Sequence, residues 1–366
     1  MSTPRLEVRL DDLAHNTRTL ADRLGRRGIA VCAVTKATLG SPTIARVLLE
    51  AGAATLGESR IENIESLRRG GIDAEIMMIR GPMLSQVDRV VEHASVSLNS
   101  ELVVVEALSA AAVRRNSRHR VVLMVELGDL REGVMPADVP AFVDRVAAMA
   151  GVELVGVGTN LACQNGVVPD RTNMAELASV AAIVEGRTGT KLQIVSGGNS
   201  ANLDWALDPD QHMGAVNHLR LGESILLGRE PTQRRPIDGL RTDAFTLVAE
   251  VIESKKKPRQ PWGVQGQAAF TSDPIEPAAA SGSSTGECSG VRRVLVAVGR
   301  QDVDPAGLTP PAGLRLVGAS SDHLILESTS LRPPPIGAEL RFGLDYAALV
   351  RASTSPFVEH EYVVDR

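Results

Sequence analysis

The sequence predicts an α/β protein in which a (β/α)8 barrel is followed by a smaller, mostly β domain. Short apolar runs rich in β-branched residues alternate with segments of helical period over roughly the first 235 residues. Eight such strand–helix units fit the size of a (β/α)8 barrel, which is typically about 250 residues. Beyond that point Gly and Pro separate short apolar runs, and few segments are long enough for a helix.

The candidate barrel strands are continuous apolar runs, as expected of parallel strands that are buried on both faces. They cover residues 29–34, 53–57, 74–79, 95–98, 121–127, 152–158, 192–195 and 216–221.

Helical patterns separate these strands. Ser41 and Pro42 begin the first of them as an N-cap and a first-turn proline. Its apolar positions keep a helical period at Ile44, Val47, Leu48 and Ala51. Similar patterns cover residues 59–69, 100–116, 137–150 and 172–187. A doubly wound open sheet is the alternative, but no GxGxxG motif follows the first strand.

The change of pattern divides the chain into a barrel domain, residues 1–235, and a β-rich domain, residues 236–366. The candidate strands of the second domain cover residues 244–252, 291–298, 314–318 and 323–327. Residues 271–290 are small and polar, which predicts a flexible loop or insertion.

Composition excludes several classes of function. A formal charge of -5 and a pI near 5.9 argue against nucleic acid or an anionic membrane as the partner. The start of the chain lacks the apolar region of a signal peptide, so we expect a cytoplasmic protein. The three cysteines, Cys32, Cys163 and Cys288, have neither metal-ligand spacing nor a disulfide pattern.

Polar residues follow the apolar strands at the end where barrel enzymes carry their chemistry. The first is Lys36, directly after the run 29–34. The others are Glu58, Arg80, Asn99, Arg131, Asn160, residues 196–200, Arg220, Gly222 and Glu223. Taken alone, Lys36 would read as a strand-end lysine whose ammonium reaches water. The repetition of polar residues at the ends of the other strands favours a binding site.

The stretch VSGGNSAN, residues 195–202, has the composition of a phosphate-binding loop. Gly197 and Gly198 let backbone N–H groups approach an anion, and Ser196 and Ser200 add hydroxyls. The loop falls between the seventh and eighth strands, where barrels commonly bind phosphate. Together with Lys36 and Arg220, it predicts pyridoxal 5'-phosphate, since a lysine among arginines reaches the neutral amine that bonds an aldehyde.

At these residues the sequence resembles the fold-type III pyridoxal-phosphate enzymes, the alanine racemase superfamily, and within it the ornithine racemase branch. Apart from residues 271–290, the resemblance spans nearly the whole chain. Stretches that carry it include LDDLAHNTRTL, AVTKATLGSP, VELGDLREGVMP, VSGGNSANL, NHLRLGESILLGRE, AVGRQDVDPAGL and LDYAALV.

The resemblance implies a role for individual residues. Lys36 would form the covalent link to the cofactor and act as a catalytic base. Arg220 would bond the pyridine nitrogen, Arg131 would lie near the phenolic oxygen and contact substrate, and Asn160 takes the place of a common histidine. The remaining cofactor-binding residues would be Ser196, Gly197, Gly198, Ser200, Gly222 and, from the second domain, Tyr346.

The sequence departs from alanine racemases at three places. Arg300 replaces the tyrosine that serves as the second base, and Met124 replaces a lysine that some members carry in carbamylated form. A tyrosine shortly after Lys36 is also missing. A racemase still needs a proton carrier opposite Lys36, and the candidates are Cys163, Asp302 and His323.

The expected activity is racemisation of a basic amino acid, ornithine first, with lysine, arginine or alanine as alternatives. A carboxylate would accept the terminal ammonium of such a substrate, with Glu58 and Asp322 as the candidates. Asp129, Glu132 and Glu223 are also acidic and belong to the same set of carboxylates. The resemblance implies a homodimer in which one chain's second domain closes its partner's barrel.

Two other functions stay open on the same scaffold. A decarboxylase of this type would pair the pyridine nitrogen with a carboxylate, which Arg220 disfavours. A non-enzymatic pyridoxal-phosphate carrier would resemble the barrel only, which residues from 236 onward disfavour.

Overall fold

The computed structural model describes residues 4–259, 261–264, 266, 269–270 and 290–364. The chain forms two compact units, Leu10–Ala244 and a second one built from residues up to Arg9 together with Phe245–Val364. The division therefore lies nine residues beyond the expected position after residue 235, and the first strand belongs to the second unit. Most of the expected loop at 271–290 lies outside the described residues.

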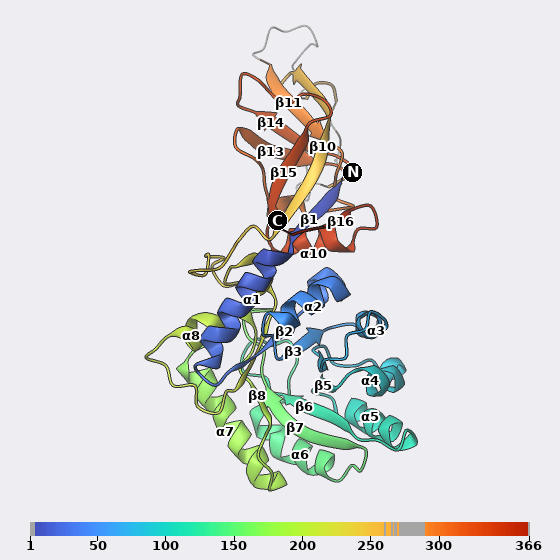
Figure 1. The fold of residues 1–366 in the computed structure, drawn as a ribbon, viewed down its shortest axis with the longest axis vertical. Helices are drawn as coiled ribbons and strands as arrows, with labels where there is room; N and C mark the ends of the chain where they lie inside the picture. Colours follow the sequence, from blue (N-terminus) through green and yellow to red (C-terminus); the bar gives the residue numbers. More distant parts are fainter. Residues whose placement is uncertain (1–3, 260, 265, 267–268, 271–289, 365–366) are drawn as a thin grey trace. The chain divides into compact units, whose positions relative to one another are not determined.

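The first unit is a closed parallel barrel, as predicted (Figure 1). Each strand pairs in parallel with the next, and the last one, β9, pairs back onto β2 with Ala30 opposite His218. The eight strands are β2 (Ala30–Val34), β3 (Thr55–Glu58), β4 (Ile76–Met78), β5 (Val96–Asn99), β6 (His119–Met124), β7 (Val152–Gly158), β8 (Ile194–Ser196) and β9 (His218–Leu221). All eight predicted strands overlap an observed one.

Helices follow the strands and surround them. The Ser41 hydroxyl accepts from the Ile44 N–H at 3.4 Å, so the predicted N-cap is present. The helices of this unit are α1 (Leu10–Gly25), α2 (Pro42–Glu50), α3 (Ile61–Arg69), α4 (Val87–His93), α5 (Leu102–Arg114), α6 (Val139–Ala147), α7 (Arg171–Thr188), α8 (Leu203–Leu207) and α9 (Glu223–Leu227).

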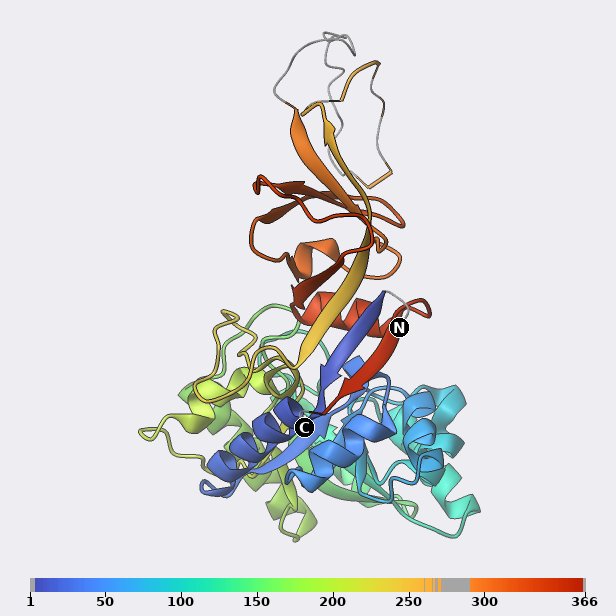
Figure 2. The ribbon, with the colours of Figure 1, turned by 45° about the horizontal axis from the view of Figure 1, so that its top comes forward.

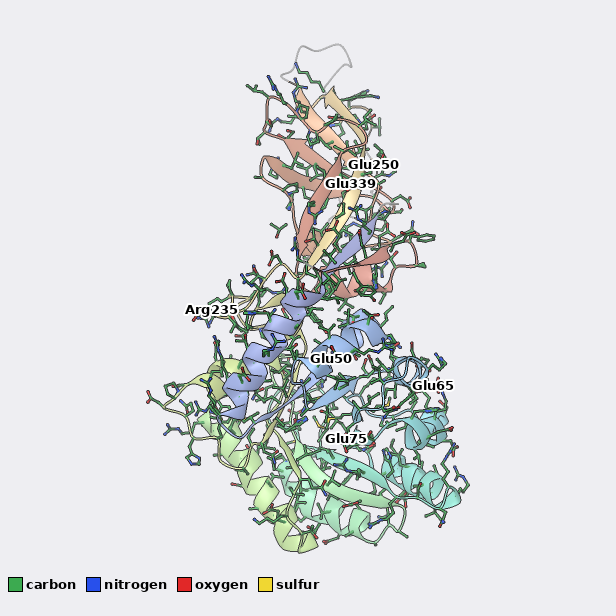
Figure 3. The ribbon with its side chains drawn as sticks, viewed as in Figure 1. Glu50, Glu65, Glu75, Arg235, Glu250 and Glu339 are labelled. Carbon is green, nitrogen blue, oxygen red and sulfur yellow. The ribbon has the colours of Figure 1, made fainter. Side chains whose placement is uncertain are left out.

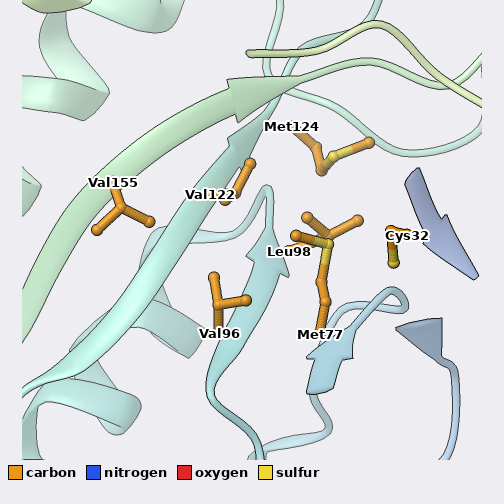
Figure 4. Packing of buried hydrophobic residues seen from close by; sticks show 7 residues of the cluster. All are labelled: Cys32, Met77, Val96, Leu98, Val122, Met124 and Val155. Atoms are coloured by element: carbon orange, nitrogen blue, oxygen red, sulfur yellow. The ribbon is translucent and has the colours of Figure 1, made fainter. Parts of the chain in front are cut away.

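An apolar cluster fills the barrel (Figure 4). Its members come from β2 and from β4 to β7: Cys32, Met77, Val96, Leu98, Val122, Met124 and Val155, each at most 2% exposed. Full burial of such a side chain stabilises the fold by about 1.5–3 kcal/mol. Met124, which the resemblance places where some alanine racemases carry a carbamylated lysine, belongs to this hydrophobic core.

The amino ends of the strands are closed by polar contacts on the side of the barrel away from Lys36. Arg120 donates to Glu75 at 2.6 Å and to Gln193 at 3.0 Å (Figure 3 labels Glu75). Arg120 lies near the start of β6, and its two partners directly precede β4 and β8. Arg120 therefore links β6 to β4 and β8 at the end of the barrel opposite Lys36.

The second unit is a mostly antiparallel sheet in the order β12-β15-β10-β11-β14-β13. The long strand β10 (Phe245–Lys257) runs through it (yellow in Figure 2) and pairs with the N-terminal strand β1 (Arg5–Arg9). Its other elements are β11 (Val291–Val296), β12 (Leu308–Thr309), β13 (Leu314–Ala319), β14 (Leu324–Ser328), β15 (Glu339–Leu344), α10 (Tyr346–Thr354) and β16 (Glu359–Val363).

Burial of Arg5 fixes β1 in this sheet. The Arg5 side chain is 10% exposed and forms ion pairs with Glu7 at 2.9 Å and Glu339 at 2.7 Å. Across the described residues no helix combines the length and the apolar composition needed to span a bilayer.

Candidate active site

Lys36 lies at the carboxyl end of β2, as the sequence predicts. The preceding residue, Thr35, is fully buried, and its N–H donates to the Gly57 carbonyl at 2.9 Å. The chain then turns into a short 3-10 helix, Lys36–Thr38, and the Lys36 side chain is exposed at the mouth. The buried strand therefore fixes the backbone of a lysine whose amine stays accessible.

The surroundings of Lys36 favour its neutral amine. Desolvation by the surrounding protein is the main cause that lowers the pKa of Lys36, and the charges of Arg131 and Arg220 lower it further. Cys163 and Glu58 act in the opposite direction. The Lys36 side chain is exposed at the surface, although protein surrounds it at longer range. A neutral amine can attack a carbonyl carbon and can take a proton.

Arg220, on β9, is the buried cation of the site, with 4% exposure. It donates through Nη2 to the Thr159 carbonyl at 2.9 Å and through Nη1 to the Ser196 hydroxyl. Burial lowers the pKa of Arg220 to about 10, so its guanidinium stays protonated at neutral pH. The structure thus holds a hydrogen-bond donor, fixed by the ends of two neighbouring strands, beneath the mouth.

Asn160 contacts Arg220. Its Oδ1 accepts from Arg220 Nη2 at 3.4 Å and from Asn199 Nδ2 at 3.2 Å. Its Nδ2 is buried and has no hydrogen-bond partner. An unpaired buried donor costs about 1–3 kcal/mol, so this nitrogen points to a missing acceptor at the site.

The loop 196–200 has the geometry of an anion cradle. Gly198 has φ +138, and a Cβ there would lie 2.2 Å from Asn202 Oδ1. A Cβ on Gly197 would lie 2.9 Å from Val216 Cγ1. Asn202 closes the turn, because its Nδ2 donates to the Gly197 carbonyl at 2.8 Å and its Oδ1 accepts from the Asn199 N–H at 3.1 Å. Only glycines permit this close approach of the backbone.

Ser200 joins this loop to the next one. Its buried hydroxyl accepts from the N–H of Gly222 at 3.3 Å and of Ser224 at 3.2 Å, and it shares a hydrogen bond with the Ser224 hydroxyl. The predicted phosphate-loop residues, including Gly222, therefore lie together at the carboxyl ends of β8 and β9.

Arg131 and Cys163 come from the loops that follow β6 and β7. Arg131 Nη1 donates to Cys163 Sγ at 2.8 Å, while its Nε and Nη2 donate to the Glu132 carboxylate. Glu126 fixes the Arg131 loop by accepting from the N–H groups of Gly128 at 2.6 Å and Leu130 at 3.0 Å. Cys163 is exposed and close enough to Lys36 to influence its charge.

Asp129 ties these two loops together. It is fully buried, and its carboxylate accepts from the N–H groups of Cys163 at 3.1 Å, Gln164 at 2.9 Å and Asn165 at 3.0 Å. Burial alone would raise the pKa of Asp129, but these backbone donors outweigh it and hold the pKa below its usual range. The acidic residue therefore fixes Cys163 rather than a substrate.

Glu58 does not face the mouth. A Cβ on Gly57 would meet Cys32 and Val34 inside the barrel, so the next residue along the strand points to the opposite side. Glu58 is fully buried and accepts from the Ser59 N–H at 2.7 Å and the Thr35 hydroxyl at 3.1 Å. Its burial raises its pKa. The structure thus gives Glu58 no surface for a substrate ammonium.

The other sequence candidates lie in the second unit. Asp302 is buried and accepts from the Gly299 N–H at 3.2 Å and the Ser355 hydroxyl at 2.9 Å, so both carboxylate oxygens hold local structure. His323 shares a hydrogen bond with Ser320, and Asp322 accepts from Gln301 at 2.6 Å. The Arg300 guanidinium carbon lies over the Phe270 ring, 5.3 Å from its centroid. Tyr346 begins α10.

Comparison with known proteins identifies the family. The family model described as alanine racemase, N-terminal domain, matches residues 8–230. The chain belongs to this alanine racemase family. A lysine racemase from Thermotoga maritima is 36% identical over 366 residues, covering 99% of each chain. An ornithine racemase from Acetoanaerobium sticklandii is 33% identical over 362 residues, covering 98% of this chain and 99% of the relative.

Solved structures share the fold of this chain. An alanine racemase from Streptomyces lavendulae superposes with a TM-score of 0.74 at 22% identity, covering 100% of this chain and 99% of that one. A D-threonine aldolase from Filomicrobium marinum superposes with a TM-score of 0.73 at 16% identity, covering 96% of this chain and 88% of that one. The alanine racemase family is a family of pyridoxal-phosphate enzymes, and the racemase chain described here is an isomerase.

The residues present fit that cofactor. Asn160 Nδ2 is a buried donor without a partner, and the close contacts of Gly197 and Gly198 leave a cradle bounded by backbone. No group of three or more His, Cys, Asp or Glu residues that could hold a metal occurs in the part of the chain that the structure describes.

Sequence reasoning missed several supporting residues. The Thr35 hydroxyl donates to Glu58, and the Thr159 carbonyl accepts from Arg220. Neither threonine belongs to a sequence motif that would have marked it. Asn199 and Asn202 were visible within VSGGNSAN, where asparagines at i and i+3 are typical of a self-bonded turn.

Proposed function

We propose that this racemase uses pyridoxal 5'-phosphate to invert Cα of a basic amino acid, ornithine first, with lysine, arginine and alanine as alternatives. The observation that carries the proposal is the placement of Lys36 at the barrel mouth, with a lowered pKa, beside the buried Arg220 and the glycine cradle. The chemistry needs all three in one place: an amine, a fixed cation and an anion site.

The cofactor, when bound, supplies an electron sink for the pair of electrons left at Cα. Lys36 would hold its aldehyde carbon, the loop 196–200 with Gly222 its phosphate, and Arg220 its ring nitrogen. Because the Arg220 guanidinium can only donate, it would leave that nitrogen unprotonated and favour return of a proton to Cα. Lys36 Nζ would take or return the Cα proton on one face, since its surroundings favour the neutral amine.

Two relatives support a basic substrate, because they are named as lysine and ornithine racemases. Of the two predicted partners for the terminal ammonium, Glu58 is enclosed, which leaves Asp322 as the candidate. Exchange of Asp322 for Ala would lower the preference for ornithine over alanine, and Glu58→Gln would leave that preference unchanged. An unaltered ratio in the Asp322 variant would remove this candidate.

The rival functions are less well supported. A decarboxylase would need a carboxylate where Arg220 lies, and a carrier protein would not need the second unit. We also propose that the protein is a cytoplasmic homodimer, which light scattering would test through its mass.

The cofactor proposal is tested by adding pyridoxal 5'-phosphate to purified protein. We expect a visible absorption band and, after borohydride reduction, a mass increase on the peptide that contains Lys36. Lys36→Ala should lose both, while Lys191→Ala should keep both, because Lys191 is an exposed lysine paired with Glu185. Colourless protein, or an adduct confined to other lysines, would refute the proposal. Screening each L-amino acid for its D-enantiomer then gives the substrate.

A further inference from the structure

We infer that Cys163 is the second proton carrier of this site and acts opposite Lys36. The inference rests on the proposed racemase function and on the replacement of the usual tyrosine by Arg300. A two-sided proton exchange needs an accessible titratable group besides Lys36. Lys36 follows β2 and Cys163 lies in the loop after β7, so both come from the carboxyl ends of the barrel strands. The groups whose charge acts on Lys36 include Cys163, Arg131, Glu58 and Arg220.

Only one of these four groups has the required properties. Arg131 and Arg220 stay protonated, since guanidinium groups do not release a proton in this chemistry. The carboxylate of Glu58 is fully buried and bonded to Ser59 and Thr35. Cys163 is titratable, exposed and in the same unit as Lys36.

The position of Cys163 is fixed rather than incidental. Its backbone N–H donates to the buried Asp129, and Ala162, the residue before it, has φ +53, a strained conformation for a residue other than glycine. The sulfur accepts from Arg131 Nη1 at 2.8 Å. Arg131 is itself tied to the Glu132 carboxylate, so this contact holds the sulfur in one position.

The two residues would exchange one proton each. In one direction the Lys36 amine takes the Cα proton and becomes an ammonium, while the electron pair of the broken C–H bond stays with the substrate. The Cys163 thiol then gives its proton to the opposite face of Cα and becomes a thiolate. The other direction starts from ammonium and thiolate, so each turnover converts one protonation state of the pair into the other.

The first test measures the enzyme loaded with cofactor. Cys163→Ala should lower racemisation in both directions by about 100-fold or more, the usual contribution of a positioned acid or base. One enantiomer should still exchange its Cα hydrogen for deuterium without inversion, through Lys36 alone. Cys163→Ser preserves shape and should behave in the same way. Gln164→Ala, an exposed neighbour whose backbone bond to Asp129 is kept, serves as the control.

The second test needs no cofactor. Alkylation of Cys163 by iodoacetamide, followed on its own peptide by mass spectrometry, reports the thiolate directly. Arg131→Met should slow it several-fold at neutral pH, because the sulfur loses the cationic donor that it contacts. Melting curves and the visible band verify that the variants fold and bind cofactor. Wild-type racemisation by Cys163→Ala, or alkylation indifferent to Arg131→Met, would overturn the inference. Absence of the visible absorption band in cofactor-supplied wild-type protein would instead contradict the proposed function.

Discussion

Arg220 Nη2 donates to the Thr159 carbonyl at 2.9 Å and so joins β9 to the end of β7, although 61 residues separate the two in sequence. A second bond, from Nη1, reaches the Ser196 hydroxyl at the end of β8. One planar side chain therefore connects three consecutive strand ends. The barrel strands therefore fix the position of the Arg220 N–H groups that these two bonds leave over.

The variant Arg220→Lys tests whether the hydrogen bonds of Arg220 matter beyond its positive charge. A lysine keeps the cation but cannot reach Thr159 and Ser196 with one planar fork. We expect a loss of about 1–3 kcal/mol in the free energy of unfolding, typical of buried acceptors left unpaired. Cofactor affinity, measured by absorbance titration, should fall as well. Arg187→Lys, at an exposed pair with Asp144, should change neither property. Wild-type stability and affinity in Arg220→Lys would contradict this assignment.

Gly198→Ala should damage the anion cradle. The added Cβ would lie 2.2 Å from Asn202 Oδ1, at a φ of +138 that other residues rarely adopt. We expect a cost of about 1–3 kcal/mol in stability and weaker binding of the cofactor's phosphate. Gly186→Ala is the matched control. Apart from its chain neighbours and the backbone of its own helix, no atom lies within 4 Å of the added Cβ, and in the helix α7 alanine stabilises by roughly 0.5–1 kcal/mol. Equal stability of both variants would argue against the cradle.

Two buried histidines should make the barrel sensitive to acid. Burial lowers the pKa of His218 to about 3 and that of His119 to about 4, from an ordinary value of 6.5. The unfolded chain therefore binds more protons than the native one below pH 6.5, so stability falls as pH falls towards 4. Between its native and unfolded pKa values, each histidine adds a slope of up to about 1.4 kcal/mol per pH unit to the free energy of unfolding.

Denaturant unfolding between pH 7 and pH 4 measures this slope. His218→Gln and His119→Gln should each reduce it, and the double variant should reduce it by both amounts. Each neutral glutamine can still bond a serine, since His218 bonds Ser196 and His119 bonds Ser97. Variants whose pH profiles run parallel to that of the wild-type protein would show that the two imidazoles do not titrate on unfolding.

The barrel could be predicted from the sequence because its signals are local. Each strand is a short apolar run, and Ser41 with Pro42 marks a helix start within a few residues. Strand β1 shows the opposite case. Its residues, Arg5–Arg9, alternate charged and apolar side chains, and its partners β10 and β16 lie far along the chain. Nothing near β1 indicates that it joins the second unit.

The site could be predicted only in part for a similar reason. Strand ends place Lys36 and Arg220, and glycines mark the cradle. The orientation of Glu58 depends on which face Gly57 presents to the barrel, and the partner of Asp129 depends on two loops meeting in space. Sequence spacing gives neither. The sequence therefore groups both acidic residues with possible substrate contacts, whereas both carboxylates accept hydrogen bonds from backbone N–H groups.

Asp129→Asn should release the loop that carries Cys163. The native carboxylate accepts three N–H groups, whereas an amide offers one oxygen and turns an NH2 group towards the other donors. The lowered pKa of Asp129 means that its ionised form stabilises the fold above its ordinary pKa of 3.8, and this contribution is lost as pH falls through the native value. At neutral pH we therefore expect faster hydrogen exchange over residues 162–166 and slower racemisation.

The visible band of the cofactor should persist in Asp129→Asn, because Lys36 and the cradle depend on other strands. Asp138→Asn provides the control, since Asp138 is exposed and its side chain caps no backbone group. If hydrogen exchange in the loop stays at the wild-type rate while racemisation falls, Asp129 acts on the reaction directly. If both stay unchanged, the three backbone bonds are not needed to hold Cys163. Loss of racemisation together with faster exchange and an intact band is the result that ties loop order to proton transfer.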